Sequence, residues 1–519
     1  MMADVSVVVA VYNTMPYLKR CLASLARQTI GLDRMQVVLV NDGSTDGSGD
    51  RLDRIARRHP GTFEVIHQAN SGGPAAPSNR GLERARGRYV FFVGADDYLE
   101  PDALATAVAM ADAHASDVVA IRMAGENGRF VHQGIFARTA VDIDLATSAL
   151  AWSLSNVKLF RRALIERHAI RYPEELSVSS DQPFTLAALT HARRVSVAAD
   201  KIYYHVVRRG DASNITYSAH PEERLRCTEA IMACAERLLP AGPARDAVHR
   251  RQLTWEAAKL LEPGLLALER DDQEWICAGV GRLAKLYLTD GIGGKLDQRR
   301  RLRLSLARAG ALDALLATLA VDVRDGPPVV VSDGRAYAAY PCFRDATLGL
   351  PDSWFDVTDH AAGLVARGLT VDSVDLTARG GQWAVTVTAG VAPGATLPLG
   401  ATRVDVAAGE VSVPLTADAG APLGARLPVT ALVEACPPGG VRHPLTLRLA
   451  GLGEQRDAPI RIPGPRLGRT VYRQLGRGVY RATFKTNREG DVALDLRPVT
   501  WAHVTGWLSR RLRLKARPR

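Results

Sequence analysis

The sequence has no long hydrophobic run. Its longest apolar stretches, such as Val7 to Val11 and Tyr89 to Val93, are far shorter than the ~18 residues that cross a bilayer as a helix. The N-terminus carries Asp4 and no Lys or Arg before the first strand-like run, so it lacks the basic segment of a secretory signal. We therefore expect no transmembrane helix, no signal peptide and a cytoplasmic location.

Cysteine is scarce and scattered. The six cysteines form no CxxC pair, which argues against a disulfide framework and against a zinc site. Hydrophobic residues make up 47% and charged residues 23% of the 519 residues, and this balance excludes a disordered chain. The length suggests about three domains at roughly 150 residues each.

Positive charge is unevenly distributed. The segment from Arg466 to Arg519 holds 14 Lys or Arg and three Asp or Glu, which accounts for the whole formal net charge of +11. Such a field favours a polyanion or an anionic membrane surface, and the alternative is a solvated basic tail. In the tail, Trp507, Leu508, Leu512 and Leu514 alternate with basic residues, which predicts peripheral contact with the inner face of the cell membrane. No aromatic-interleaved basic motif accompanies the charge, so we expect no nucleic-acid partner.

Residues 1–218 alternate β-rich runs with helical patterns. Strands are predicted near residues 5–11, 37–40, 63–67, 89–93 and 118–122, with helices between them. This alternation predicts an α/β fold with a mostly parallel sheet, whose ligands lie at the carboxyl ends of the strands. The polar loops at Asp42, Asn70 and Asp96 should therefore share one rim.

The rest of the chain changes pattern twice. Residues 219–325 show helical periodicity and predict a helical linker domain. Residues 326–519 alternate or run as strands between Gly and Pro turns, which predicts β-sandwich material that ends in the basic tail.

Five motifs follow one another within the first 100 residues. They are Val5–Asn13, Val40–Asp46, Asn70–Pro74, Ser78–Gly81 and Gly87–Leu99. In this order they resemble the motifs of family 2 glycosyltransferases. The resemblance covers residues 4 to about 217 and implies a GT-A fold, a nucleotide-diphosphate sugar donor and inversion at the transferred sugar.

A nucleotide pocket is predicted at the first motifs. Asp42, just past a strand, can accept the imide N–H of a uracil ring, although it could instead be an Asx-turn residue that only shapes the loop. By the resemblance, Ala10, Tyr12 and Asn70 wall the same pocket, and Tyr12 could equally be ordinary packing. We therefore expect a UDP-sugar donor.

A metal site is predicted in the last motif. By the resemblance, Asp96 is the ligand of Mn²⁺ or Mg²⁺, as the last acid of an Asp-x-Asp signature whose first acid is replaced here by Gly94. The metal should then be held by fewer protein carboxylates and mostly by substrate and water. Asp97 is expected to cap the following turn.

A second departure from the family lies at Ser78, where many relatives carry Arg before the Asn-x-Gly. Arg80 or Arg84 are the candidates to take that arginine's place.

The catalytic base is predicted at Asp181, in Ser179–Phe184. Inverting transfer needs a base that takes the proton of the acceptor hydroxyl, and Asp181 matches the position of the family's acid at the start of a helix. Its neighbour is Ser180 rather than Glu, so one acid is available. The alternative is that Asp181 is only the N-cap of that helix.

A Gly-containing loop follows the strand at residues 201–207. In the family this segment closes over the diphosphate, so Arg208, Arg209 and Ser213 are predicted phosphate contacts. A solvated Arg pair is the alternative.

The order of the parts resembles the bacterial wall teichoic acid glycosyltransferases that add N-acetylglucosamine to poly(ribitol phosphate). The resemblance implies transfer from a UDP-sugar to a hydroxyl of an anionic polyol-phosphate or other surface polymer, and a homo-oligomer through the C-terminal region. The alternatives are a catalytically weak glycan-binding scaffold, suggested by Gly94 and Ser180, and a glycosyltransferase for another capsule or cell-surface glycan. A nucleotidyltransferase is disfavoured because residues 10–16 lack a Gly-rich, basic loop.

Overall fold

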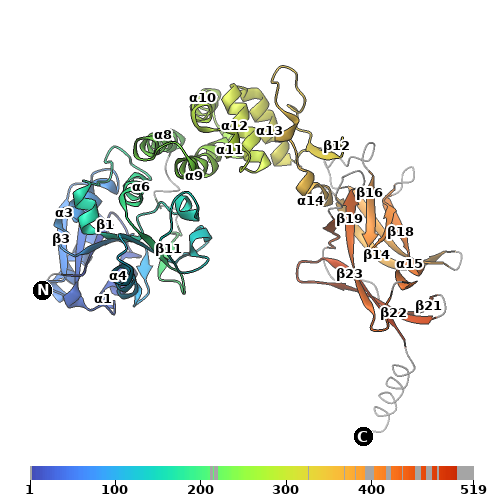
Figure 1. Cartoon of the computed structure of the whole chain (residues 1–519), viewed down its shortest axis with the longest axis horizontal. Helices are drawn as coiled ribbons and strands as arrows, with labels where there is room; N and C mark the ends of the chain where they lie inside the picture. The colour runs from blue at the N-terminus through green and yellow to red at the C-terminus, as the bar shows by residue number, and fades with distance from the viewer. Residues whose placement is uncertain are drawn as a thin grey trace, which may run out of the picture. The chain divides into compact units, whose positions relative to one another are not determined.

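The computed structural model divides the chain into two compact units, Met1–Arg300 and Arg301–Arg519 (Figure 1). It describes residues 3–210, 214, 220–324, 326–367, 369–379, 382–391, 403–416, 422–434, 436–449, 457–462, 470–475 and 478–499. The membrane-contacting residues predicted in the tail lie outside this range. The domain boundaries predicted at residues 218 and 325 stay predictions.

The first unit is built on a mixed sheet with helices on both faces. In its described part, eight strands lie in the order β3-β2-β1-β4-β9-β6-β10-β8, and β5-β11-β7 form a smaller sheet. Strands β1–β4 pair in parallel and so do β6 and β10, whereas β9 and β8 run antiparallel to their neighbours. The predicted α/β fold is confirmed. The strands are β1 (Val5–Val11), β2 (Met35–Asp42), β3 (Phe63–Gln68), β4 (Tyr89–Phe92), β5 (Tyr98–Leu99), β6 (Val118–Ile121), β7 (Met123–Glu126), β8 (Ala140–Val141), β9 (Lys158–Arg161), β10 (Val195–Ala198) and β11 (Tyr204–Val207).

The two faces of the large sheet carry separate cores. On β1, Val5, Val7 and Val9 pack into one core and Val8 into the other, because successive side chains of a strand point to opposite faces. A strand that is buried on both faces needs a near-continuous apolar run, which is the pattern of β1 and β2. The helices of this part are α1 (Leu18–Ala26), α2 (Ser48–Arg58), α3 (Ala75–Arg84), α4 (Ala103–His114), α5 (Arg162–Arg167) and α6 (Asp181–His191).

The helical region after residue 220 belongs partly to the first unit. Helices α8 (Pro221–Leu238) and α9 (Pro243–Gln252) contribute Ala235, Leu239 and Val248 to the core that also holds Phe184 of α6. These helices are therefore fixed against the sheet domain. They are followed by α10 (Arg270–Tyr287), α11 (Asp290–Gly293), α12 (Gln298–Ala309), in which the second unit begins, and α13 (Leu312–Arg324).

The second unit is rich in β-structure after its first helices, as predicted. Its described strands form the sheets β12-β13, β14-β15-β18 and β17-β16-β19-β23-β22-β21, with β20 paired to β19. The elements are β12 (Val329–Ser332), β13 (Arg335–Ala338), α14 (Ala361–Arg367), β14 (Leu369–Arg379), β15 (Gln382–Val391), β16 (Val404–Ala408), β17 (Val411–Pro414), β18 (Leu423–Pro428), α15 (Val429–Glu434), β19 (Val441–Leu449), β20 (Asp457–Pro459), β21 (Val471–Leu475), β22 (Gly478–Thr486) and β23 (Val492–Pro498).

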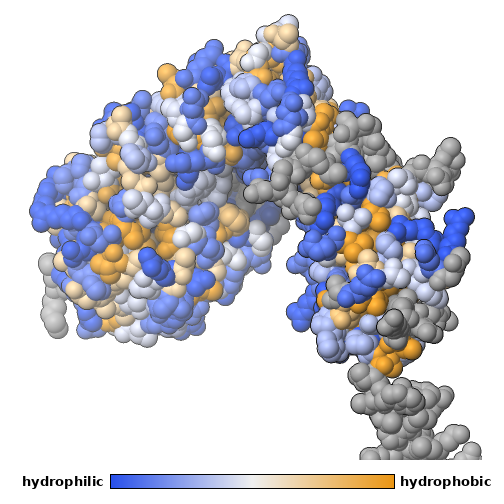
Figure 2. Space-filling view, turned by 45° about the vertical axis from the view of Figure 1, so that its right-hand side comes forward, coloured by the Kyte–Doolittle hydropathy of each residue, from blue (hydrophilic) through white to orange (hydrophobic). Residues whose placement is uncertain are grey.

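The surface is dominated by hydrophilic residues with scattered apolar ones on the face that Figure 2 shows. Within the described residues, no helix has the length and apolar character that a membrane crossing requires. All six cysteines are free thiols.

Candidate active site

A cavity of about 410 Å³ lies at the carboxyl ends of the parallel strands. It forms there because β1 ends at Val11, β2 at Asp42 and β4 at Phe92, and the loops that follow turn over the same rim. Six predicted nucleotide-sugar residues line it together: Ala10, Tyr12, Asp42, Asn70, Asp96 and Arg209. We call this space the donor cavity.

The other predicted donor residues lie elsewhere. Arg80 is on α3, does not line the donor cavity, and forms an ion pair of 3.2 Å with Glu83. Arg208 precedes Arg209 but does not line the cavity, and its carbonyl accepts a hydrogen bond from Asn127 at 3.1 Å. Ser213 lies outside the described residues.

Asp42 is buried at 2% exposure, and its carboxylate is already used by the protein. It accepts hydrogen bonds from the side-chain amide of Gln68 at 2.7 Å and from the hydroxyl of Ser71 at 2.9 Å, and the backbone N–H of Ser71 lies 3.1–3.2 Å from both of its oxygens. A carboxylate offers about four acceptor positions, so these contacts orient it and leave room for one further donor. Asp42 thus shapes the loop that carries Ser71, and its binding of a uracil ring stays a prediction.

Asp96 accepts hydrogen bonds from one guanidinium and one side-chain amide of the segment after β11. Its Oδ2 accepts from Nε of Arg209 and from Nδ2 of Asn214, each at 2.9 Å. Asn214 also accepts the backbone N–H of Arg209 at 2.9 Å. Asp96 therefore holds the start of the predicted diphosphate-closing loop next to the donor cavity.

The sequence suggested that Asp97 caps the following turn, but its carboxylate has other partners. It is buried at 7% exposure, and it accepts hydrogen bonds from the hydroxyl of Tyr204 at 2.7 Å and from the backbone N–H of Val207 at 2.8 Å. Burial, reinforced by the nearby Asp96, raises the pKa of the Asp97 carboxyl to about 8. Its role is to anchor β11 beneath the site.

Gly94, at the first position of the Asp-x-Asp signature, has little room for a side chain. A Cβ atom on Gly94 would lie 2.5 Å from Oδ2 of Asp97 and 3.2 Å from Oδ1 of Asp96. A side chain at this position would thus collide with a buried carboxylate. Among the residues that the structure describes, no group of three or more His, Cys, Asp or Glu side chains could hold a metal.

A divalent metal would fit this site if one protein carboxylate and the substrate's phosphate oxygens held it together. Mg²⁺ and Mn²⁺ are commonly bound by one or two carboxylates together with substrate phosphate oxygens. Asp96 is the half-buried carboxylate of the donor cavity, and its Oδ1 carries none of the hydrogen bonds described above. Asp96 and a bound diphosphate would therefore share the metal.

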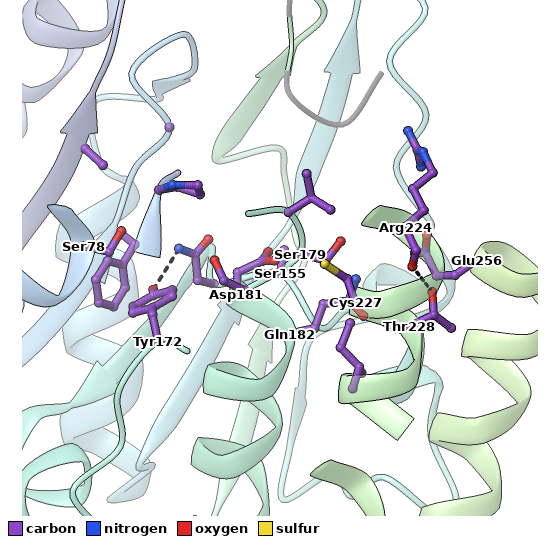
Figure 3. A pocket seen from close by; sticks show the side chains of 18 of the residues that line it. Ser78, Ser155, Tyr172, Ser179, Asp181, Gln182, Arg224, Cys227, Thr228 and Glu256 are labelled. Carbon is purple, nitrogen blue, oxygen red and sulfur yellow. Dashed lines mark hydrogen bonds between the residues drawn. The ribbon is translucent and has the colours of Figure 1, made fainter. Parts of the chain in front are cut away.

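A second cavity of about 400 Å³ adjoins the first and contains Asp181 (Figure 3). The two cavities share Ala10, Pro74, Gly94 and Arg129 in their walls. Asp42 and Asp96 thus line one cavity and Asp181 lines its neighbour, across a common wall. We call the second space the acceptor cavity, for reasons given below.

Asp181 is the first residue of α6, and Ser180 precedes it as the N-cap without a side-chain capping bond. Burial raises the pKa of the Asp181 carboxyl above its ordinary value, and the positive charges of Arg251 and Lys158 oppose this rise. Figure 3 shows Asp181 beside Tyr172 and Ser155, with Arg224 and Glu256 across the cavity. An acid with a raised pKa that faces a cavity is suited to take up a proton.

Lys158 lies behind Asp181 and is completely buried. Its ammonium donates to the carbonyl oxygens of Ser153 at 2.6 Å and Ser155 at 2.8 Å. Burial lowers its pKa to about 7, and the negative charge of Asp181 opposes this shift. Lys158 belongs to none of the sequence motifs, although a lysine inside the apolar run Val157–Phe160 was a usable signal.

The helical region completes the acceptor cavity. Arg224, Cys227, Thr228 and Ile231 of α8 line it, together with Arg251 of α9 and Glu256 of the π-helical turn Leu253–Ala257. Nη1 of Arg251 lies 3.0 Å from Oε1 of Glu256 and donates to Oε1 of Gln182 at 2.7 Å. No local motif marks these residues, so the sequence could not have assigned them to the site.

Comparisons with known proteins find matches for two parts of the chain. Residues 6–145 match the family described as Glycosyl transferase family 2, and residues 221–319 match the glycosyl transferase TarS linker domain. The poly(ribitol-phosphate) beta-N-acetylglucosaminyltransferase TarS of Staphylococcus aureus is 38% identical over 223 residues, which are 43% of this chain and 39% of that protein. The poly(ribitol-phosphate) beta-glucosyltransferase of Bacillus spizizenii is 34% identical over 41% of this chain and 34% of its own length. The matches thus span about two fifths or less of these curated relatives.

Solved structures agree on the fold. The crystal structure of S. aureus TarS aligns with 96% of this chain and 86% of its own chain, at a TM-score of 0.64 and 23% identity. TarS residues 1–349 in complex with UDP-GlcNAc align with 65% of this chain and 97% of that chain, at a TM-score of 0.57 and 29% identity.

Proposed function

We propose, from the premise that residues 6–145 form a family 2 glycosyltransferase domain and residues 221–319 a TarS-type linker domain, that this protein is an inverting glycosyltransferase. It transfers a sugar from a UDP-sugar to a hydroxyl of an anionic cell-wall polymer such as teichoic acid. The observation that carries the proposal is the common wall between the cavity of Asp42 and Asp96 and the cavity of Asp181.

The donor cavity binds the UDP-sugar. Asp42, held by Gln68 and Ser71, accepts the uracil imide N–H, and Arg209, which contacts Asp96, binds the diphosphate. A metal at Asp96, Mn²⁺ or Mg²⁺, would neutralise charge on the departing diphosphate. N-acetylglucosamine is the favoured sugar, because a TarS structure with UDP-GlcNAc is among the similar structures.

The acceptor cavity holds the nucleophile. Asp181 takes the proton of the acceptor hydroxyl, whose oxygen attacks the anomeric carbon on the face opposite the departing UDP. The C–O bond to the diphosphate breaks as the new glycosidic bond forms, so the configuration inverts. The positive charges of Arg251 and Lys158 oppose the rise in the pKa of the buried Asp181 carboxyl and so favour its carboxylate form.

The acceptor is a polymer with regular negative charge. This part of the proposal is supported by the names of the relatives, which act on poly(ribitol phosphate), and by the basic residues of the C-terminal end. The same positive charge supports a cytoplasmic enzyme that works at the inner face of the membrane. Oligomerisation through the C-terminal region is proposed from the resemblance to the teichoic acid glycosyltransferases alone.

The proposal is tested by the release of UDP from a panel of UDP-sugars with purified protein and Mn²⁺. Slow hydrolysis of one donor is expected, followed by faster UDP release when poly(ribitol phosphate) is added. Binding of the polymer without turnover of any UDP-sugar would favour the glycan-binding scaffold. Turnover with a different surface glycan only would favour the other glycosyltransferase reading.

A pH profile tests the electrostatics around Asp181. Replacing Arg251 with Gln removes a positive charge that opposes the raised pKa of Asp181, so the pKa should rise further. Because only the ionised base accepts a proton, the acid limb of the kcat profile should move to higher pH by about 1 unit.

The matched control is Arg237→Gln, which removes an exposed arginine of α8 that does not line the cavity. Its acid limb should coincide with that of the wild type. An unmoved limb in the Arg251 variant would show that Arg251 does not act on the base.

A further inference from the structure

A third cavity, of about 400 Å³, lies where the parallel strands β6 and β10 begin, at the opposite strand ends from the active site. Strands β6 and β10 begin here, at Val118 and Val195, and the antiparallel β9 ends here, at Arg161. The other end of β9, Lys158, lies behind Asp181. The cavity is lined by Ala115, Asp117, Arg161, Ala163, Leu164, Arg167, His191, Arg193 and Arg194, and we call it the basic cleft.

The basic cleft has a large excess of positive charge. Four arginines line it against one carboxylate, Asp117. Each oxygen of that carboxylate already accepts one hydrogen bond, from Nε of Arg161 at 2.7 Å and from the backbone N–H of Arg193 at 2.9 Å. The neighbouring Glu166 lies outside the lining and pairs with Arg162.

Three of the arginines are not neutralised. In the described part of the chain, no carboxylate forms an ion pair with Arg167, Arg193 or Arg194. Arg194 donates from Nη1 to the carbonyl of His114, and its buried Nε has no hydrogen-bond partner among the described residues. Arginines that are left unpaired around a hollow repel one another and favour an anion between them.

Arg161 fixes one wall of the cleft. Besides Asp117, it donates from Nη2 to the carbonyl of Ser116 at 2.9 Å, and its guanidinium carbon lies 5.1 Å from the ring centre of Tyr89. Arg161 is thus held at the end of β9, Arg193 and Arg194 directly before β10, and Arg167 at the end of α5.

We infer that the basic cleft binds a phosphodiester group of the polyanionic acceptor polymer at a point distant from the reacting hydroxyl. This inference rests on the proposed function. A guanidinium presents donors in a fork that matches two phosphate oxygens, and several of them around one hollow suit a chain with a phosphate in every repeat. Attachment there raises the local concentration of the polymer's other hydroxyls at Asp181.

The surroundings of the cleft favour a polymer over a membrane. Ten large apolar side chains are exposed among the described residues, for example Tyr12, Phe130 and Trp275. None of these ten comes from the segments 115–117, 161–167 or 191–194 that build the cleft. A membrane-binding surface combines basic residues with apolar ones that enter the lipid.

The test uses the full-length double variant Arg167→Gln/Arg193→Gln, in which both substituted side chains are exposed. Binding of a fluorescently labelled ribitol phosphate oligomer is measured by anisotropy at low salt and without UDP-sugar. The double variant should bind about tenfold more weakly, and Arg167→Glu/Arg193→Glu more weakly still. The control Arg57→Gln/Arg58→Gln, at the exposed end of α2, removes the same charge elsewhere and should bind like the wild type.

Three outcomes decide the matter. Equal affinity of the cleft variants and the control variant would overturn the inference. Normal oligomer binding with lost sedimentation on phosphatidylglycerol vesicles would overturn it in favour of a lipid headgroup. Selective loss of oligomer binding supports it, and competition by inorganic phosphate in the wild type adds to that support. Because binding is measured without donor, this result is separate from any failure to turn over UDP-sugars.

Discussion

Replacing Asp181 with Asn should lower the rate of sugar transfer by about 100-fold to 10,000-fold, the usual contribution of a general base. Asn has nearly the same shape and can still stand in the first turn of α6, but it cannot accept the proton of the acceptor hydroxyl. The donor cavity is lined by other residues, so the affinity for the UDP-sugar should change little. Transfer is measured as glycosylated polymer, and donor affinity by titration with UDP-sugar.

The control for this prediction is Glu175→Gln, which removes an exposed carboxylate shortly before α6. It should transfer at the wild-type rate. If the Asp181 variant keeps near-normal turnover while it folds normally, Asp181 is only a residue of the helix start, and the base must be another group.

Replacing Asp96 with Asn should reduce transfer by at least about 100-fold and weaken activation by Mn²⁺. Two effects combine at this position. The substitution removes the half-buried carboxylate that a metal could share with the diphosphate, and it removes the anion that pairs with Arg209 at 2.9 Å. Since Gly94 supplies no second carboxylate, no neighbouring side chain at the first position of the signature can compensate.

The measurement is the rate of transfer against Mn²⁺ concentration, with a chelator as the zero point. Asp102→Asn is the control, because this partly exposed carboxylate pairs with Lys201 and does not line the donor cavity. A variant of Asp96 that responds to Mn²⁺ like the wild type would show that the metal is held by substrate alone or is not needed.

The first half of the fold was predictable because its signals are local. The apolar runs of β1 and β2 are buried on both faces, and the alternation with helices predicted the parallel pairing that the structure has. The rule that loops at the carboxyl ends of parallel strands share one rim also placed Asp42 and Asp96 correctly in one cavity.

The acceptor side was less predictable because it depends on packing between distant segments. Asp181 was named from its motif, but its charged neighbours come from β9 and α9, and no spacing rule relates Lys158 or Arg251 to it. Asp97 was assigned to a local turn, whereas its partners Tyr204 and Val207 lie more than 100 residues further along the chain.

The sequence by itself determined the sheet, the position of its ligand-binding rim and the acids that stand on it. The reason is that the hydrophobic periodicity of a strand or helix, and the place where a strand ends, depend on residues that are neighbours in the sequence. Only the tertiary structure decided that helices of the linker close the cavity around Asp181, and that four arginines line a cavity at the opposite ends of the strands. The physical reason is that burial and charge balance at a site are sums over side chains that folding brings together from far apart, and a linear reading cannot add them.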